Sequence, residues 1–213
     1  MQKLSVALSA YIMRPRAASE VYPQYGIGLQ AGYSVRTGLG SMFTPNCYSM
    51  LYGYLPGITR TQGVMISALY QHQKRAGLFR ENGINVSPRG FTGVTPYLES
   101  HSRNQLKISV DYAIPIWVGD ITCFSPLFYI KNFELTPRAD FLTFSEGRSM
   151  SDGNLFSAGF KLTACLGNLL WIPYDCKIGL SVDFNGGNAV DKMKKSGCLV
   201  DSHHIGFVFE MNL

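Results

Sequence analysis

The sequence predicts an all-β protein, an antiparallel up-and-down transmembrane β-barrel to which this chain contributes about eight or nine strands, as part of a larger barrel. Apolar and polar residues alternate with a period of two along most of the chain, as in strands with two different environments. Charged residues make up only 15% of the 213 residues, too few to cover the surface of a soluble domain. No stretch reaches the ~20 apolar residues of a membrane-spanning helix, so any crossing must use strands.

The first strand is expected at residues 3–13. A charged start at Lys3 followed by an apolar run also resembles the beginning of a signal peptide. Arg14 and Arg16, however, lie where a cleavage site needs small neutral residues, and the run alternates between apolar and polar positions. A strand is the preferred interpretation, with a cleaved signal peptide as the alternative.

The next strands are expected at 25–35, 42–54 and 61–72. Segment 25–35 has large apolar residues on one face and glycine, glutamine and serine on the other. The other two segments are rich in tyrosine, methionine and serine and alternate less regularly. A polar connection at 73–103 follows and is expected to be a long external loop. No segment of the chain shows the periodicity of a helix.

The remaining strands are expected at 104–116, 128–143, 155–166, 173–184 and 203–213. In each of them an apolar face opposes a polar one, and the last strand stays apolar on one face up to Leu213. Connections alternate between short and long, as in transmembrane barrels with short periplasmic turns and long external loops. All these strands are expected to form one domain over 1–213.

The two faces of the later strands differ in charge, which indicates the face that meets lipid. Mixed charges occupy the polar faces: Lys107, Asp111, Glu134, Arg138, Asp140, Lys161, Asp175, Lys177, Asp183 and Glu210. Acids and bases in this mixture could pair across a lumen. The apolar faces are nearly uncharged, and we expect them to contact lipid. Aromatic residues near the strand ends fit interfacial girdles, namely Tyr112, Trp117, Trp171, Tyr174 and Phe184.

The parity of the strands bears on whether the barrel is complete. A complete bacterial barrel has an even number of strands and both termini in the periplasm. If residues 3–13 form a strand, the number is odd, and the chain is expected to be the C-terminal part of a larger barrel. Upstream strands would then pair with 3–13, because an open edge there would be unstable alone. If 3–13 belong to a signal peptide, the remaining strands form a complete barrel.

The long connection contains one motif, Pro88-Arg89-Gly90-Phe91. The tripeptide is weak evidence alone, because a turn with a solvated arginine contains the same residues. Its position adds weight, since the next two strands carry Asp111 and Asp140 on their polar faces. A loop folded into the lumen could bring Arg89 to these carboxylates, in a charge-assisted and often bidentate pair.

This layout resembles the outer-membrane insertase and two-partner-secretion transporter superfamily. In that family an Arg-Gly-Phe/Tyr loop enters the barrel lumen ahead of the final strands. The resemblance covers about residues 80–213 and implies protein translocation or insertion, with Asp111 and Asp140 as partners of Arg89. The chain is also similar to the C-terminal barrels of Bacteroidetes outer-membrane proteins that carry a periplasmic β-propeller.

The chain departs from the superfamily in three respects. Pro88 stands where a small aliphatic residue is commoner, and Leu213 stands where a terminal aromatic residue is typical. The chain also contains no periplasmic client-binding repeats. Insertase or secretion activity is therefore expected to need upstream strands or a periplasmic domain in addition to this chain.

No pattern of enzyme or cofactor chemistry stands out. His72, His101, His203 and His204 lack metal-ligand spacing, nothing resembles a nucleophile elbow, and no basic run suggests nucleic acid. We expect no catalytic residues, metal, cofactor or nucleic-acid partner. The expected partner is the lipid bilayer of the outer membrane of a Gram-negative bacterium. The alternatives are a passive pore or scaffold barrel, a soluble β-barrel that binds an apolar ligand, and an outer-membrane hydrolase.

Overall fold

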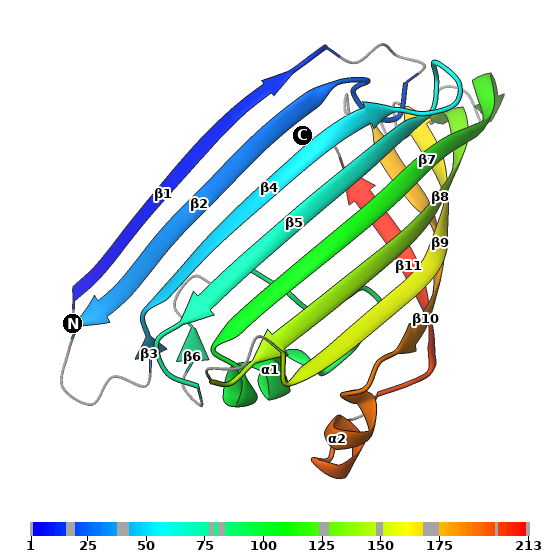
Figure 1. The fold of residues 1–213 in the computed structure, drawn as a ribbon. Helices are drawn as coiled ribbons and strands as arrows, with labels where there is room; N and C mark the ends of the chain where they lie inside the picture. Colours follow the sequence, from blue (N-terminus) through cyan, green and yellow to red (C-terminus); the bar gives the residue numbers. More distant parts are fainter. Residues whose placement is uncertain are drawn as a thin grey trace.

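A computed structural model describes residues 2–15, 20–37, 43–76, 79–80, 84–123, 128–147, 151–167, 175–198 and 200–211. Within these residues the main body is a nine-stranded sheet in which every strand lies beside its neighbours along the chain (Figure 1). All its pairings are antiparallel. In order, its strands are β1 (Gln2–Met13), β2 (Gly26–Thr37), β4 (Asn46–Pro56), β5 (Gly63–Gln73), β7 (Asn104–Cys123), β8 (Phe128–Ser145), β9 (Gly153–Gly167), β10 (Cys176–Gly186) and β11 (His203–Met211). The predicted all-β, up-and-down order is confirmed.

The connections hold more structure than the sequence predicts. Two short strands, β3 (Phe43–Thr44) and β6 (Phe79–Arg80), pair in parallel, and two helices, α1 (Thr95–His101) and α2 (Val190–Lys195), lie at one end of the sheet. These two helices were not among the elements that the sequence predicts. Both helices are too short to show a periodic apolar face, although a proline in the first turn of α1 is a common feature of helix starts.

The sheet is curved but does not close into a barrel within the described residues. β1 and β11 form its two edges, so these strands do not form the complete barrel that was expected only if residues 3–13 belonged to a signal peptide. Parity gives the physical reason. In an antiparallel meander with an odd number of strands, the first and last strands run in the same direction. Closing β1 onto β11 would therefore require a parallel pair, unlike every other pair in the sheet.

The two faces of the sheet have opposite character. We call the face that carries residues 84–94 the inner face and the other the outer face. The register places a continuous set of exposed apolar side chains on the outer face, including Leu8, Leu29, Leu51, Ile66, Ile108, Phe141, Phe160, Leu180 and Phe207. The inner face buries polar side chains, including Gln71, Gln105, Glu134, Thr136, Asp140, Thr163 and Asp183. This is the reverse of a soluble sheet, which buries its apolar side.

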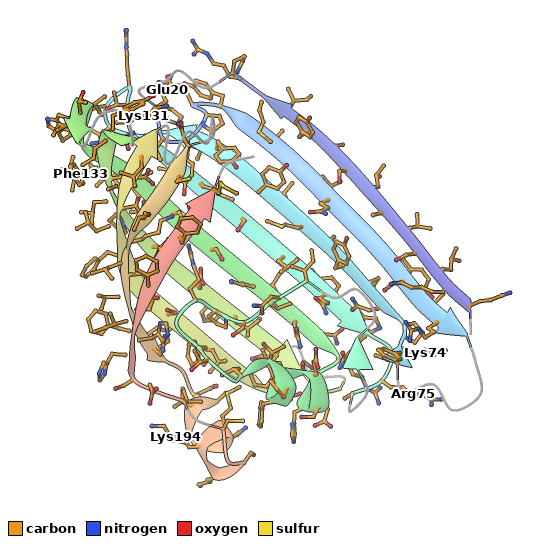
Figure 2. The ribbon with its side chains drawn as sticks, turned by 180° about the vertical axis from the view of Figure 1, so that it is seen from behind. Glu20, Lys74, Arg75, Lys131, Phe133 and Lys194 are labelled. Carbon is orange, nitrogen blue, oxygen red and sulfur yellow. The ribbon has the colours of Figure 1, made fainter. Side chains whose placement is uncertain are left out.

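A small apolar core covers the inner face at one end of the strands. It joins the 84–94 segment, α1 and α2 to the sheet through Leu69, Val86, Phe91, Val94, Leu98, Leu142, Phe144, Leu155, Ala189, Met193 and Val200. Figure 2 shows this end, which we call the helix end, with Lys74, Arg75 and Lys194 near it, whereas Glu20, Lys131 and Phe133 lie at the opposite end. Among the described residues, neither helix has the length and apolar character needed to span a membrane.

Several predicted aromatic positions can be placed on the sheet. Trp117 and Phe184 are exposed, and Tyr112 donates a hydrogen bond from its hydroxyl to Gln62 Oε1 (2.5 Å). Trp171 and Tyr174 lie outside the described residues, as does the terminal Leu213.

Candidate functional site

The motif Pro88-Arg89-Gly90-Phe91 forms a reverse turn that rests on the inner face. We call residues 84–94 the Arg89 loop. The Phe91 amide donates to the Pro88 carbonyl at 3.3 Å, and Gly90 has a φ of +82°. A positive φ at the third residue of a turn favours glycine, and the turn directs Arg89 at the sheet.

Asp140 on β8 receives most of the hydrogen bonds that Arg89 donates. The Arg89 amide donates to Asp140 Oδ2 at 2.7 Å, Nε lies 3.1 and 3.0 Å from the two carboxylate oxygens, and Nη2 lies 2.5 Å from Oδ1. The Asp140 side chain is only 1% exposed. A buried carboxylate needs such partners, because leaving it unpaired would cost several kcal/mol, about 3–5 in comparable cases.

Asp111 on β7 contacts the other side of the same guanidinium. Nη1 donates to its Oδ2 at 2.9 Å, and Nη2 lies 2.6 Å from its Oδ1. This Oδ1 has no geometrically acceptable hydrogen bond, so its contact with Nη2 is an ion pair only. Lys107, also on β7, lies 3.4 Å from Asp140 Oδ2 and donates to the Ser87 carbonyl at 2.9 Å. Lys107 thus links the sheet to the backbone of the Arg89 loop.

Gly90 contacts β10, two strands beyond β8. A Cβ atom at Gly90 would lie 2.6 Å from Asp183 Cβ and 2.8 Å from Asn185 Oδ1. The Asn185 side-chain amide donates to the Gly90 carbonyl at 2.9 Å. Glycine is therefore required twice, once for its φ and once for this close approach.

The flanking motif residues anchor the turn through apolar contacts. Phe91 and Val86 belong to the apolar core, and Pro88 is buried. Burying aromatic and branched side chains favours the docked loop by roughly 1.5–3 kcal/mol for each fully buried one. The loop is held by packing at both ends and by charge in the middle.

The guanidinium of Arg89 is protonated in this site. Burial lowers the pKa of its guanidinium, but the hydrogen bonds to Asp140 and Asp111 and the attraction of both carboxylates outweigh burial and raise that pKa above its ordinary value. Arginine stays protonated even without this help. The contacts therefore serve to position the Arg89 side chain, because they hold its planar guanidinium between β7 and β8.

The other charged side chains on the inner face of the later strands also occur in pairs. Arg138 donates to Asp183 at 2.9 and 2.7 Å, and the remaining pairs are Lys177 with Glu134 (2.8 Å), Lys131 with Asp175 (2.5 Å) and Lys161 with Glu210 (3.0 Å). Together with the contacts of Arg89 they form what we call the ion-pair wall, on β7 to β11. Within it, acids and bases are equal in number.

A second segment approaches the site from the end opposite the helices. Tyr22, in the connection between β1 and β2, packs on Tyr54 with ring centroids 5.7 Å apart and lies over Gly63. Burial raises the pKa of its phenol, and the negative charges of Asp111 and Glu134 raise it further. Tyr22 is therefore a neutral group close to the ion-pair wall.

The structure brings together every site residue that the sequence predicts. Arg89 contacts both Asp111 and Asp140, which lie on adjacent strands. Sequence reasoning did not assign Lys107 to the site, although it shares the polar face of Asp111. The contact of Gly90 with Asp183 and Asn185 carried no sequence signal, since it depends on how far the sheet curves.

Comparison with known proteins adds no assignment. The chain matches no protein-family model, and neither a curated protein nor a solved structure is detectably similar to it. Among the described residues, no group of histidine, cysteine and acidic side chains is arranged to hold a metal ion.

Proposed function

We propose that the chain is part of an outer-membrane β-barrel that takes part in protein translocation or insertion. The observation that carries this proposal is the Arg89 loop, held on a polar inner face by Asp111 and Asp140 beneath a sheet whose outer face is apolar. A loop fixed there occupies the route through the barrel, where it would contact a passenger.

The outer face supports a membrane location. Its exposed side chains are apolar from β1 to β11, while the charges of β9, β10 and β11 all lie on the inner face. Strands with apolar residues outward and polar residues inward are the pattern of transmembrane barrels. Recovery of the protein in the outer-membrane fraction, soluble only with detergent, is the expected result. Solubility without detergent would instead favour the soluble ligand-binding barrel.

The open edges support the presence of further strands in the working barrel. β1 is exposed on both faces along almost its whole length, and unpaired backbone groups in lipid are costly. Because β1 and β11 run in the same direction, an odd number of additional strands would complete an antiparallel barrel. A second copy inserted in the same orientation would pair in parallel at both seams. Upstream strands of the same polypeptide, with or without a periplasmic domain, are the partners we propose.

A passive pore is the second candidate, because the inner face is polar. Planar-bilayer conductance that survives deletion of residues 83–92 would favour it. The Arg89 loop and the apolar core lie across the inner face at the helix end, which argues against a permanently open channel.

The test of the proposed function is Arg89→Ala. Removing the guanidinium leaves Asp140 with only the backbone amide of residue 89 (2.7 Å) and Lys107 (3.4 Å), and leaves Asp111 without its hydrogen bond. We expect faster proteolysis within the Arg89 loop and reduced transport of client protein in cells. Arg103→Ala, at an exposed arginine near the helix end, is the matched control. Unchanged protease sensitivity together with unchanged transport would overturn the proposal.

A further inference from the structure

The inner face of β2, β4 and β5 differs from the ion-pair wall. Tyr22 covers it at one end, on Tyr54 and Gly63, and the apolar core reaches it at the helix end through Leu69 and Met50. Its inward side chains are mainly glycine, tyrosine, methionine, glutamine and serine, and its one charged side chain on β2 is Arg36, near the helix end. We call its central part the tyrosine wall, formed by Gly28, Gln30, Gly32, Tyr48, Met50, Tyr52, Met65 and Ser67.

Cross-strand glycines determine how the tyrosine rings lie. Gly28 pairs with Tyr52, and Gly32 pairs with Tyr48. A Cβ atom at Gly28 would overlap the phenol end of Tyr52, and one at Gly32 would lie 2.5 Å from Tyr48 Cζ. The rings therefore lie down across β2 instead of standing out from the sheet.

The wall has unused binding capacity. Tyr48, Tyr52, Met65 and Ser67 are all half-buried, so part of each side chain still faces the open side of the sheet. Within the described part of the chain, the hydroxyls of Tyr48 and Tyr52 make no hydrogen bond. Rigid tyrosines supply large contact area at low entropic cost, serine and glycine supply adaptable contacts, and methionine repacks around different partners.

We propose that the tyrosine wall binds an extended, uncharged stretch of polypeptide. Inward side chains along β4 repeat at about 6.7 Å, the spacing of same-face side chains in any extended chain. A peptide lying along β4 would thus meet the wall in register over several residues. The wall carries no charge to pair with a charged segment, and the neighbouring ion-pair wall is already paired within itself. This inference deepens the proposed translocation function and rests on it for the nature of the occupant.

The test measures peptide binding to the purified full chain in detergent. The probe is a fluorophore-labelled, uncharged peptide of alternating serine and valine, followed by anisotropy. Tyr52→Phe keeps the ring over Gly28 and removes only the hydroxyl, so the fold is retained. We expect binding to weaken about fivefold, as for loss of one neutral hydrogen bond. Tyr33→Phe, the same change at an exposed position on the outer face of β2, should leave binding unchanged.

The other outcomes of these experiments distinguish failure of the binding inference from failure of the proposed function. No saturable peptide binding, or equal effects of the two variants, overturns the inference, and so does a neutral glucan that binds this wall in place of the peptide. If the peptide binds through Tyr52 but Arg89→Ala leaves transport intact, the proposed function fails and the binding site stands. If Arg89→Ala abolishes transport and no peptide binds, the binding site fails and the proposed function stands.

Discussion

The ion-pair wall and the tyrosine wall belong to one sheet with one topology, yet their inward side chains differ. Those of the ion-pair wall are charged and paired, whereas those of the tyrosine wall are uncharged. On β7 to β11, buried acids such as Asp140 and Asp183 are matched by bases on neighbouring strands or in the Arg89 loop. On β2 and β4, glycines leave room for tyrosine rings, and almost no charge is present. A charged wall fixes its contents by specific pairs, whereas a neutral aromatic wall stays able to accept varied partners. We therefore propose that the ion-pair wall positions the Arg89 loop and that the tyrosine wall is where a passenger binds.

The largest effect should come from a buried pair with no spare partner. Arg138→Ala would leave Asp183, whose side chain is 2% exposed, without its base. We expect the free energy of unfolding to fall by about 3–5 kcal/mol, measured by denaturant titration in detergent. The double variant Arg138→Met, Asp183→Leu should recover most of that loss, because it removes both charges. A loss below about 1 kcal/mol in the single variant would show that water reaches the Asp183 carboxylate and that the ion-pair wall is open to solvent there.

A smaller effect is expected when a Cβ atom is added under a tyrosine ring. Gly28→Ala must displace the phenol end of Tyr52, and overpacking of this kind typically costs about 1–3 kcal/mol. Gly53→Ala is the matched control, since its nearest neighbour, the Gly26 carbonyl oxygen, lies 3.7 Å away. The measurement is again denaturant titration, with tyrosine fluorescence reporting the ring. Equal stability of the two variants would show that the glycines do not position the rings.

The smallest effect is expected at the margin of the ion-pair wall. Lys161 pairs with Glu210 on the edge strand β11, and the Glu210 side chain is 45% exposed. An ion pair that is this open to solvent contributes about 0–1 kcal/mol. Lys161→Ala should therefore change stability by no more than that in the same titration. A loss comparable to that of Arg138→Ala would mean that additional strands cover β11 and bury the pair.

The sequence predicts the strands of this protein well, because period-two alternation is a local property that each strand carries by itself. It also identifies Arg89, Asp111 and Asp140, since their residue types and faces can be read without knowing the sheet. It does not predict α1 and α2, which are too short for a periodic signal. Nor does it predict that Gly90 reaches Asp183, or that Tyr52 covers Gly28. Those contacts depend on curvature and on cross-strand register, which emerge only when distant segments pair.

The contact between Gly90 and Asn185 has a consequence for the order of folding. Every pairing in the sheet joins successive long strands, so the sheet can grow one hairpin at a time with small loop-closure costs. Arg89 and Asp140 are 51 residues apart, and their contact can form once β8 is in place, whereas Gly90 and Asn185 are 95 residues apart and must wait for β10. We expect the Arg89 loop to become protease-resistant in two stages during refolding, the second coinciding with docking of β10. Full protection of the Arg89 loop would therefore indicate that β10 has joined the sheet.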